Sequence, residues 1–184
     1  MFSYVVFPRI LRETLWAIGF FVLLISQMTL IGCRRGSCEG VACLNGGACR
    51  GGRCSCPAGF EGGRCEIKWT DSWTGNYTVD DRCAVVGFIP QYEAQITPST
   101  VYPDVVYFEG FGDIRCEGQR LRVEGRLIGR DRVEIARQSS CNRRYTIWGS
   151  GWRDGARRTL TIEYYYQDFQ TGLSDSCRAT WVKF

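Results

Sequence analysis

Cysteine is the residue type with the most reactive side chain in this chain of 184 residues. There are eleven cysteines and no histidine. Without an imidazole, the chain lacks the general base of Ser-His-Asp and Cys-His catalysis, and it lacks histidine ligands for zinc. Many cysteines in one chain are typical of proteins that fold in an oxidising compartment, where thiols pair as disulfides. The sequence therefore favours crosslinking over catalysis by these residues.

Two pairs of carboxylates and a group of aromatic side chains are the other candidates for chemistry. Glu163 with Asp168, or Glu109 with Asp113, supply the two acids that glycoside hydrolysis needs, but nothing in the sequence selects a proton donor. Aromatic side chains stack on sugars or line ligand pockets, and the candidates are Tyr145, Trp148, Trp152, Tyr164, Tyr165 and Tyr166. Core packing is a sufficient role for those that point inward. We expect no enzymatic activity, no metal and no cofactor.

The charged residues argue against nucleic acid as a partner. The formal net charge is +4, with 19 acids spread among 23 bases. Nine arginines lie between Arg115 and Arg144, but acids such as Glu124, Asp131 and Glu134 are interleaved with them. A solvated strand face with mixed charge accounts for this pattern better than an anion-binding patch.

Six of the cysteines fall within the 28 residues from Cys38 to Cys65. So short a segment buries little apolar surface, and its stability must depend on crosslinks. Zinc is not favoured, because the segment contains no pair of C-x2-C sequences. Its motifs are Cys43-Leu44-Asn45-Gly46-Gly47-Ala48-Cys49 and Cys54-Ser55-Cys56-Pro57-Ala58-Gly59-Phe60-Glu61-Gly62-Gly63-Arg64-Cys65. With these motifs, residues 38–65 resemble an EGF-like domain.

The resemblance implies a first-to-third, second-to-fourth and fifth-to-sixth connectivity, one of the many that six cysteines allow. The implied pairs are Cys38–Cys49, Cys43–Cys54 and Cys56–Cys65. We expect this module to be a rigid spacer that holds the following domain away from a membrane. A specific protein-binding role is the alternative.

The N-terminal segment is typical of exported proteins. Arg9 and Arg12 precede a stretch without charge from Thr14 to Cys33, which is the pattern of a signal peptide. This stretch is also long enough to span a bilayer, so a permanent anchor is the alternative. Its end, Leu30-Ile31-Gly32-Cys33, resembles the lipobox of bacterial lipoproteins. By that resemblance, residues 1–32 are removed and Cys33 carries lipid.

The number of cysteines supports lipidation independently of the lipobox. An acylated Cys33 cannot form a disulfide, and the ten remaining cysteines can pair completely. In the best-known sorting rule, retention at the inner membrane requires Asp after the lipidated cysteine. Arg34 stands there, so the resemblance implies the outer membrane. The tether, residues 33–37, lacks the acids that send some lipoproteins to the cell surface, and both the periplasmic and the surface-facing side stay open.

Residues 69–184 have the pattern of an all-β domain. Short runs rich in aromatic and β-branched residues recur between turn residues, and in several of them apolar and charged residues alternate. Val133 and Ile135, for example, alternate with Arg132 and Glu134, as in half-buried strands. The expected strands are Gly75 to Arg82, Tyr92 to Ile96, Val105 to Glu109, Leu121 to Ile128, Arg132 to Gln138, Tyr145 to Trp152, Thr159 to Asp168 and Cys177 to Phe184.

The connections predict how these strands are arranged. Gly129-Arg130-Asp131, Asp154-Gly155 and Thr171-Gly172 are turn sequences that join neighbouring strands directly, which indicates an up-and-down meander. Eight such strands close most simply into an antiparallel barrel, because closure removes exposed edges. A β-sandwich is the alternative. The arrangement resembles the lipocalin-like β domains that follow an EGF-like module in some bacterial lipoproteins, a likeness of architecture that transfers no functional residue.

The other four cysteines are expected on one rim of this barrel. In an eight-stranded meander, alternate connections lie at the same end, and Cys83, Cys116, Cys141 and Cys177 occupy such positions. Closure makes the first and last strands neighbours, about 4.8 Å apart, which is within reach of a disulfide. We predict Cys83–Cys177 and Cys116–Cys141. The same rim also allows Cys83–Cys116 with Cys141–Cys177.

Together, these features predict a lipid-anchored protein of the cell envelope whose EGF-like spacer presents a β-barrel with a binding or structural role. The alternatives are a barrel that binds a carbohydrate or a small hydrophobic ligand, and, with less support, an enzyme. The expected partners are the membrane, through lipid on Cys33, and envelope proteins or glycans.

Overall fold

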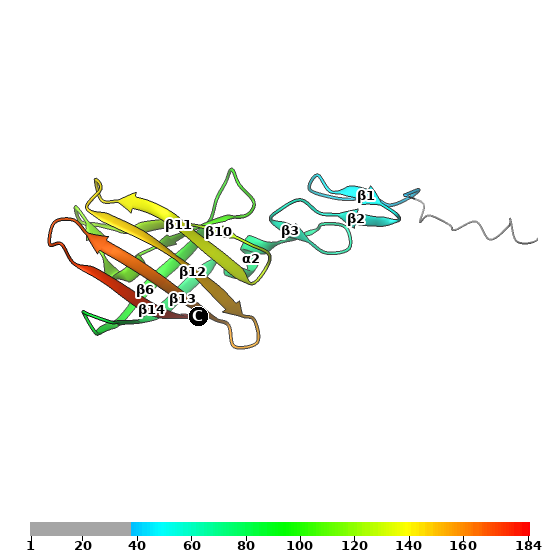
Figure 1. The fold of residues 1–184 in the computed structure, drawn as a ribbon. Helices are drawn as coiled ribbons and strands as arrows, with labels where there is room; N and C mark the ends of the chain where they lie inside the picture. Colours follow the sequence, from blue (N-terminus) through cyan, green and yellow to red (C-terminus); the bar gives the residue numbers. More distant parts are fainter. Residues whose placement is uncertain (1–37) are drawn as a thin grey trace, which may run out of the picture. The chain divides into compact units, whose positions relative to one another are not determined.

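The computed structural model describes residues 38–184, which form one compact unit (Figure 1). The expectations for residues 1–32 and for the tether 33–37, including lipid on Cys33, lie outside the described residues. Within residues 38–184, no helix is both long enough and apolar enough to cross a bilayer.

Residues 38–68 form two small antiparallel sheets crosslinked by three disulfides. β1 (Ala48–Arg50) pairs with β2 (Arg53–Ser55), and β3 (Phe60–Glu61) pairs with β4 (Ile67–Lys68). Gly51 and Gly52 join β1 to β2 with φ angles of 60° and 80°, which a two-residue hairpin turn of this kind requires. The disulfides are Cys38–Cys49, Cys43–Cys54 and Cys56–Cys65. These pairs match the connectivity implied by the sequence motifs.

Most of the remaining residues form a closed barrel of eight antiparallel strands (Figure 1). Its strands are β5 (Gly75–Cys83), β6 (Phe88–Pro98), β7 (Val105–Glu109), β10 (Arg122–Leu127), β11 (Arg132–Ser140), β12 (Tyr145–Asp154), β13 (Thr159–Asp168) and β14 (Ser174–Lys183). Each strand pairs with the next in the chain, and β14 pairs with β5 to close the barrel. The predicted all-β fold and up-and-down meander are confirmed, and the sandwich alternative is excluded.

Alternation along the strands explains why this sequence closes around a core. In β10, Val123, Gly125 and Leu127 are buried while the residues between them are exposed. At Gly125 a Cβ atom would lie 2.7 Å from both the Phe108 ring and a Val133 methyl group. Close packing across the barrel therefore leaves no room for a side chain at this position.

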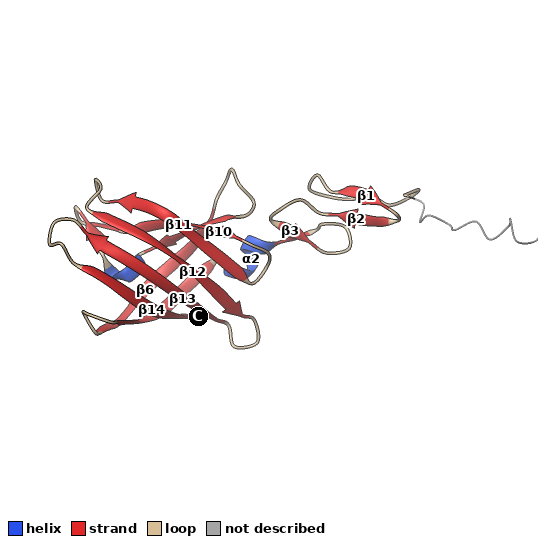
Figure 2. Cartoon of the chain, viewed as in Figure 1, coloured by secondary structure: helices blue, strands red, loops and turns tan. Residues whose placement is uncertain are grey.

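Three short elements were not predicted from the sequence. They are α2 (Trp69–Trp73), the 3₁₀ turn η1 (Phe111–Asp113), and the hairpin of β8 (Arg115–Cys116) with β9 (Gln119–Arg120). The two helical segments are blue among the red strands in Figure 2. Elements of five residues or fewer are too short to show a helical or strand period. The predicted start of β6 at Tyr92 was four residues late, because the strand begins with residues that do not alternate in burial.

Two further disulfides crosslink the barrel domain: Cys83–Cys177 and Cys116–Cys141. They match the pairs predicted from the meander. Cys83 and Cys177 are directly opposite in the register of β5 and β14, with Cα atoms 4.0 Å apart. This bond therefore joins the first and last strands, where the barrel closes.

Candidate functional site

The interior of the barrel is occupied by large side chains. The ring of Trp181 on β14 packs edge-on against Phe108 of β7 and Tyr77 of β5, with centroids 5.4 and 5.8 Å apart. Phe111 of η1 lies beside them, with its ring centroid 4.6 Å from that of Tyr164. All five side chains are buried. These rings occupy the space that a small hydrophobic ligand would need inside the barrel.

A buried carboxylate, Asp81 on β5, lies among the interior rings. The hydroxyls of Tyr92 and Tyr164 donate to its Oδ2 atom over 2.9 and 2.8 Å. The backbone N–H of Gly112 donates to the Tyr92 hydroxyl over 3.0 Å. Burial raises the pKa of Asp81, and the two tyrosine hydrogen bonds oppose this rise only in part. Because Asp81 has no exposed surface, we assign this network the structural role of tying η1 to β5, β6 and β13.

Arg144 and Asp168 form an ion pair at the end of β13. The guanidinium donates to both carboxylate oxygens, over 3.2 and 3.0 Å. The Asp168 side chain is only 7% exposed, whereas that of Arg144 is 41% exposed. Hydrogen bonds from Arg144 lower the pKa of Asp168 to about 2. The ionised form of Asp168 therefore stabilises the folded chain.

Replacing Asp168 by asparagine is expected to lower the free energy of unfolding at pH 6 by about 1–2 kcal/mol, allowing for the exposed arginine. The folded pKa is below the unfolded value of about 3.9. The difference in the free energy of unfolding between the wild type and the variant therefore has its full size above that pKa. This difference disappears as the pH falls towards 2. Urea denaturation at pH 6, 4 and 2.5 measures the difference. Asp154→Asn, at an exposed contact with Arg157 of 3.6 Å, is the control and should change little at any pH.

Glu163 and Asp168, one of the carboxylate pairs that the sequence singles out for hydrolysis, do not lie on the same side of the sheet. Glu163 and Asp168 lie on opposite faces of β13, one exposed and one buried, because successive residues of a strand alternate between faces. Glu163 lies 3.6 Å from Arg178, and Glu109 lies 3.0 Å from Arg122. The geometry therefore gives Glu163 and Glu109 ion-pair roles, and it does not place Glu163 and Asp168 around a common substrate.

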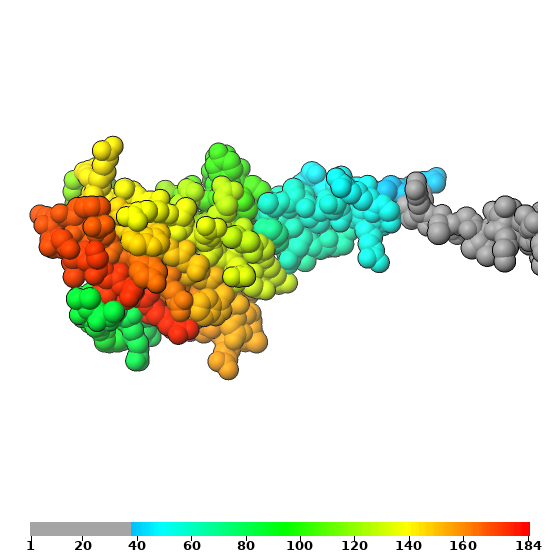
Figure 3. All heavy atoms as spheres, in the orientation of Figure 1, coloured from blue at the N-terminus to red at the C-terminus, as the bar shows by residue number. Residues whose placement is uncertain are grey.

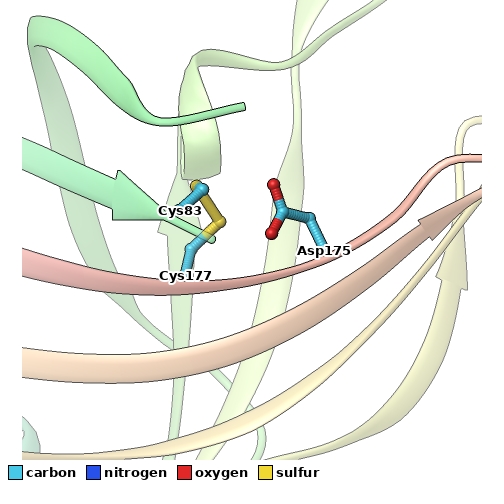
Figure 4. A group of neighbouring side chains, drawn as sticks. All are labelled: Cys83, Asp175 and Cys177. Atoms are coloured by element: carbon cyan, nitrogen blue, oxygen red, sulfur yellow. A yellow bond between two sulfur atoms is a disulfide. The ribbon is translucent and has the colours of Figure 1, made fainter. Parts of the chain in front are cut away.

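Asp175 lies beside the Cys83–Cys177 disulfide (Figure 4). The three residues bring ligand-type atoms within 4.8 Å of one another, but sulfurs bonded to each other are not the thiolates that bind metal. Asp175 instead accepts hydrogen bonds from the backbone N–H groups of Val85 and Val86, each over 2.9 Å. Burial opposes its ionisation, but the backbone donors outweigh burial and lower the pKa of Asp175. Its role is to fix the turn between β5 and β6.

Alternation sorts the aromatic residues of β12 and β13 into inward and outward sets. Tyr164 and Tyr166 are buried, whereas Tyr165 between them is 50% exposed. Trp148 and Trp152 of β12 also lie on the outer face. In the space-filling view, β12 in yellow, β13 in orange and β14 in red form one continuous surface (Figure 3). The exposed aromatic residues therefore lie on a sheet face made by neighbouring strands.

Trp148 and Tyr165 stack on each other on this face. They are directly opposite in the register of β12 and β13, with ring centroids 5.6 Å apart and planes inclined by 13°. The guanidinium of Arg137 lies 4.4 Å from the centroid of the Trp148 ring, a cation–π contact. Because Trp148 covers the side of Tyr165 towards β12, the free face of Tyr165 turns towards β14.

A groove lies on that free side of Tyr165, across β13, β14 and β5. The register partner of Tyr165 on β14 is Ser176, and the N–H of Ala84 donates to the Ser176 carbonyl over 2.9 Å. These small side chains leave two adjoining hollows, of about 500 and 300 Å³, that share Tyr165, Ser176 and Ala84. We call this feature the Tyr165 groove, formed by Arg82, Ala84, Glu163, Tyr165, Ser176 and Arg178.

Two arginines line one side of the Tyr165 groove. Arg82 and Arg178 are directly opposite in the register of β5 and β14, and Glu163 is opposite Arg178 on β13. Arg178 is 3.6 Å from Glu163, whereas Arg82 makes no ion pair within residues 38–184. Like charges directly opposite in a sheet repel each other. Glu163 and Asp175 also line the two hollows, so the arginines and the acids around Tyr165 are equal in number.

Sequence reasoning identified Tyr165 and Trp148 but missed Arg82 and Arg178. The run of aromatic residues was a visible signal for the first two. The two arginines belong to the first and last strands of the barrel, and only the closure of the sheet brings them together. A pattern within one strand contains no signal for such a pair.

A separate hollow, of about 350 Å³, is lined by Arg153, Arg158, Lys183 and Phe184 among others. Two of its cations already have partners. Arg153 lies 2.6 Å from Asp131, and the Lys183 ammonium donates to the Thr74 carbonyl. These contacts connect neighbouring segments of the chain, so we assign Arg153 and Lys183 a structural role and take the Tyr165 groove as the candidate site.

No family model and no curated protein matches this chain. The similar solved structures include EF1p2_mFAP2b bound to DFHBI, with a TM-score of 0.46, 12% identity, and coverage of 62% of this chain and 96% of that one. A redesigned β-barrel aligns with a TM-score of 0.43 and 11% identity over 65% of this chain and 97% of its own. A protein of unknown function from Bacteroides ovatus aligns with a TM-score of 0.42 and 14% identity, over 60% and 41% of the respective chains. Identities and TM-scores this low assign no function, so the proposal below rests on the residues of the chain itself.

Proposed function

We propose that this chain is a lipid-anchored protein of the bacterial outer membrane that presents a β-barrel with a binding surface on its outer face. The observation that supports this proposal most directly is the pairing of the cysteines. All ten cysteines within residues 38–184 are paired in five disulfides, and the sequence contains eleven. Cys33, the last residue of the lipobox-like motif, is therefore the cysteine left for acylation.

The disulfide-rich segment supports the spacer role in this proposal. Its disulfides have the first-to-third, second-to-fourth and fifth-to-sixth order that the resemblance to EGF-like domains implies. Three crosslinks within 28 residues give the segment a rigidity that a flexible tether of the same length would lack. In this interpretation, residues 38–65 hold the barrel away from the lipid on Cys33.

The barrel supports binding on the outside rather than the inside. Its interior is filled by buried rings such as Trp181 and Phe108, which leaves the outer face for recognition. On that face the exposed ring of Tyr165 and the arginines of the Tyr165 groove lie together. The partners of such a protein are envelope proteins or glycans that contact the outer sheet surface.

Replacing Cys33 by serine is expected to move the protein from the membrane fraction to the soluble fraction, or to leave an unprocessed precursor. Serine cannot accept the thioether-linked lipid. A single acyl chain binds a bilayer only marginally, so stable anchoring implies at least two chains on Cys33. Membrane fractionation and the intact mass of the mature chain measure both effects.

The matched control is Ser37→Ala, a conservative change in the same tether that leaves the lipobox-like motif intact. It should retain both the membrane partitioning and the added lipid mass of the wild type. If Cys33→Ser changes neither property, the lipid anchor is wrong and the uncharged stretch from Thr14 to Cys33 acts as a permanent span.

A further inference from the structure

We propose that the barrel has a peptide-binding site between β10 and β11, where an extended segment of a partner protein pairs with β10 in place of the Gln138 side chain. This site lies on other strands than the Tyr165 groove, so the inference goes beyond the function proposed above. Three features support it: a stretch of strand with a free edge, a side-chain amide that imitates a peptide group, and a hollow beside them.

The junction of β10 and β11 is paired over only part of its length. Within residues 38–184, these strands pair at two positions, Arg126 and Leu127 of β10. On its other side, β10 pairs with β7 from Arg122 onwards, so Arg122 to Gly125 has a neighbouring strand on one side only. The register of β11 with β12 shifts after Ile135, and such a bulge bends a strand away from its partner. A free strand edge is a template for pairing with another chain.

The side chain of Gln138 occupies the place of the missing strand. Its Oε1 atom accepts a hydrogen bond from the backbone N–H of Glu124 over 2.9 Å, and its Nε2 atom donates to the Glu124 carbonyl over 2.8 Å. In an antiparallel sheet, the residue opposite Glu124 supplies the same two groups, one carbonyl and one N–H. The edge of β10 is therefore already bonded to a group with the chemistry of a peptide bond.

A hollow beside these hydrogen bonds gives a peptide room to enter. It has a volume of about 420 Å³ and is lined by Glu124, Arg126, Glu134, Ala136 and Gln138. Both bonds between Gln138 and Glu124 are exposed, so the amide can turn into solvent without leaving a buried polar group unpaired. The backbone of an extended peptide then restores the two hydrogen bonds to Glu124, as in other cases where a peptide adds a strand to a sheet.

The packing below the junction restricts the side chains of such a peptide. Side chains of a bound strand alternate between the outer face and the interior. The interior next to β10 is filled, because a Cβ atom at Gly125 would lie 2.7 Å from the Phe108 ring and from a Val133 methyl group. Inward side chains of the peptide must therefore be small, whereas those beside the exposed Glu124 can be larger and polar.

Charge and aromatic stacking do not define a different occupant. The charged residues of the lining are Glu124, Glu134 and Arg126, and Arg132 and Arg137 lie nearby along β11. Acids and arginines thus nearly balance, which favours neither an anion nor a cation. No aromatic ring lines this hollow to stack on a sugar. The hydrogen-bonding groups of the strand edge are what the site offers, and they match a polypeptide backbone.

The experiment is a fluorescence polarisation titration of the full chain in detergent micelles with a fluorescein-labelled heptapeptide, Ala-Thr-Ala-Thr-Ala-Thr-Ala amide. Its alanines suit the inward positions and its threonines the outward ones. We expect saturable binding to the wild type. The same peptide with N-methyl groups on its threonines lacks the backbone donors that face β10, and it should bind at least about tenfold more weakly.

Two variants test the site from opposite directions. Gln138→Ala removes the competing amide and should bind the peptide at least about tenfold more tightly than the wild type. Ala136→Trp fills the hollow from an exposed position while Gln138 stays in place, and it should bind at least about tenfold more weakly. Thermal unfolding checks that each variant is folded, and the tests with Ala136→Trp and with the methylated peptide do not depend on the stability of Gln138→Ala.

Two matched controls lie outside the site. Gln95→Ala removes an exposed glutamine from β6, which pairs with strands on both sides, and Tyr165→Ala alters the Tyr165 groove. Both should bind the heptapeptide as the wild type does. The proposal is overturned if the peptide binds neither the wild type nor Gln138→Ala, or if the methylated peptide binds equally well. It is also overturned if Gln138→Ala does not bind more tightly, or if Ala136→Trp binds as the wild type does.

A failure of this site would be distinguished from a failure of the proposed function. Membrane partitioning of Cys33→Ser is measured without any peptide, so it tests the lipid anchor separately. None of the residues that line the hollow between β10 and β11 belongs to the Tyr165 groove, so loss of one site would leave the other unchanged.

Discussion

Replacing both Cys83 and Cys177 by alanine is expected to lower the free energy of unfolding by about 4–5 kcal/mol in the chain-entropy model. The disulfide joins residues 94 apart in the sequence, so its loss releases a long loop in the unfolded chain. It also joins β5 to β14, the two strands at which the barrel closes. Urea denaturation of the oxidised chain, followed by the fluorescence of its tryptophans, measures the change.

The matched comparison is the double replacement of Cys116 and Cys141, which are 25 residues apart. The same model gives a smaller loss of about 3–4 kcal/mol, because the closed loop is shorter. The prediction would be contradicted if replacing Cys116 and Cys141 lowered the free energy of unfolding as much as replacing Cys83 and Cys177, or more. Loop length would then not determine how much each disulfide contributes to stability.

The architecture of the barrel follows from patterns that are local in the sequence. Val133 and Ile135 alternate with charged neighbours, and turn residues such as Gly129 separate one strand from the next. Each pattern defines a strand and its buried face, and short connections then leave the meander as the simplest arrangement. The meander also places the four barrel cysteines on one rim, and closure brings Cys83 opposite Cys177, although the same rim left the pairing of Cys83 with Cys116 and of Cys141 with Cys177 open.

The interior network could not be predicted in this way. Asp81 occupies an inward position of β5, where alternation predicts an apolar residue. Asp81 is tolerated at this buried position because Tyr92 and Tyr164 donate hydrogen bonds to its carboxylate from two other strands. A buried carboxylate is stable only with such partners, and nothing in the sequence around Asp81 identifies them.

The candidate site was predicted only in part, for a related reason. The aromatic run shows that one of Tyr164, Tyr165 and Tyr166 must differ from the others in direction, and alternation alone does not show which rings are buried. The neighbours of Tyr165 depend on the register of β12, β13 and β14. Register is a property of strand pairs, and a shift of one residue would turn Tyr165 inward.

Replacing Phe111 by alanine is expected to lower the free energy of unfolding by about 3–5 kcal/mol, the range for a buried phenylalanine. Phe111 belongs to a connection between strands, but its side chain is fully buried. Its ring contacts Phe108 at 5.9 Å, Tyr164 at 4.6 Å and Trp181 at 6.1 Å between centroids. Alanine would leave a cavity among rings that cannot easily move together.

The backbone around Phe111 explains why a residue of a connection behaves as part of the core. Gly110 and Gly112 flank it with φ angles of 87° and 66°, a left-handed conformation that favours glycine. The tight turn they form folds the ring back into the barrel, and the Gly112 N–H is held by the Tyr92 hydroxyl. The matched control is Phe169→Ala, an exposed phenylalanine in the turn after β13, which should change the unfolding free energy by less than about 0.5 kcal/mol. Similar losses from both variants in urea denaturation would show that Phe111 does not fill the barrel interior in solution.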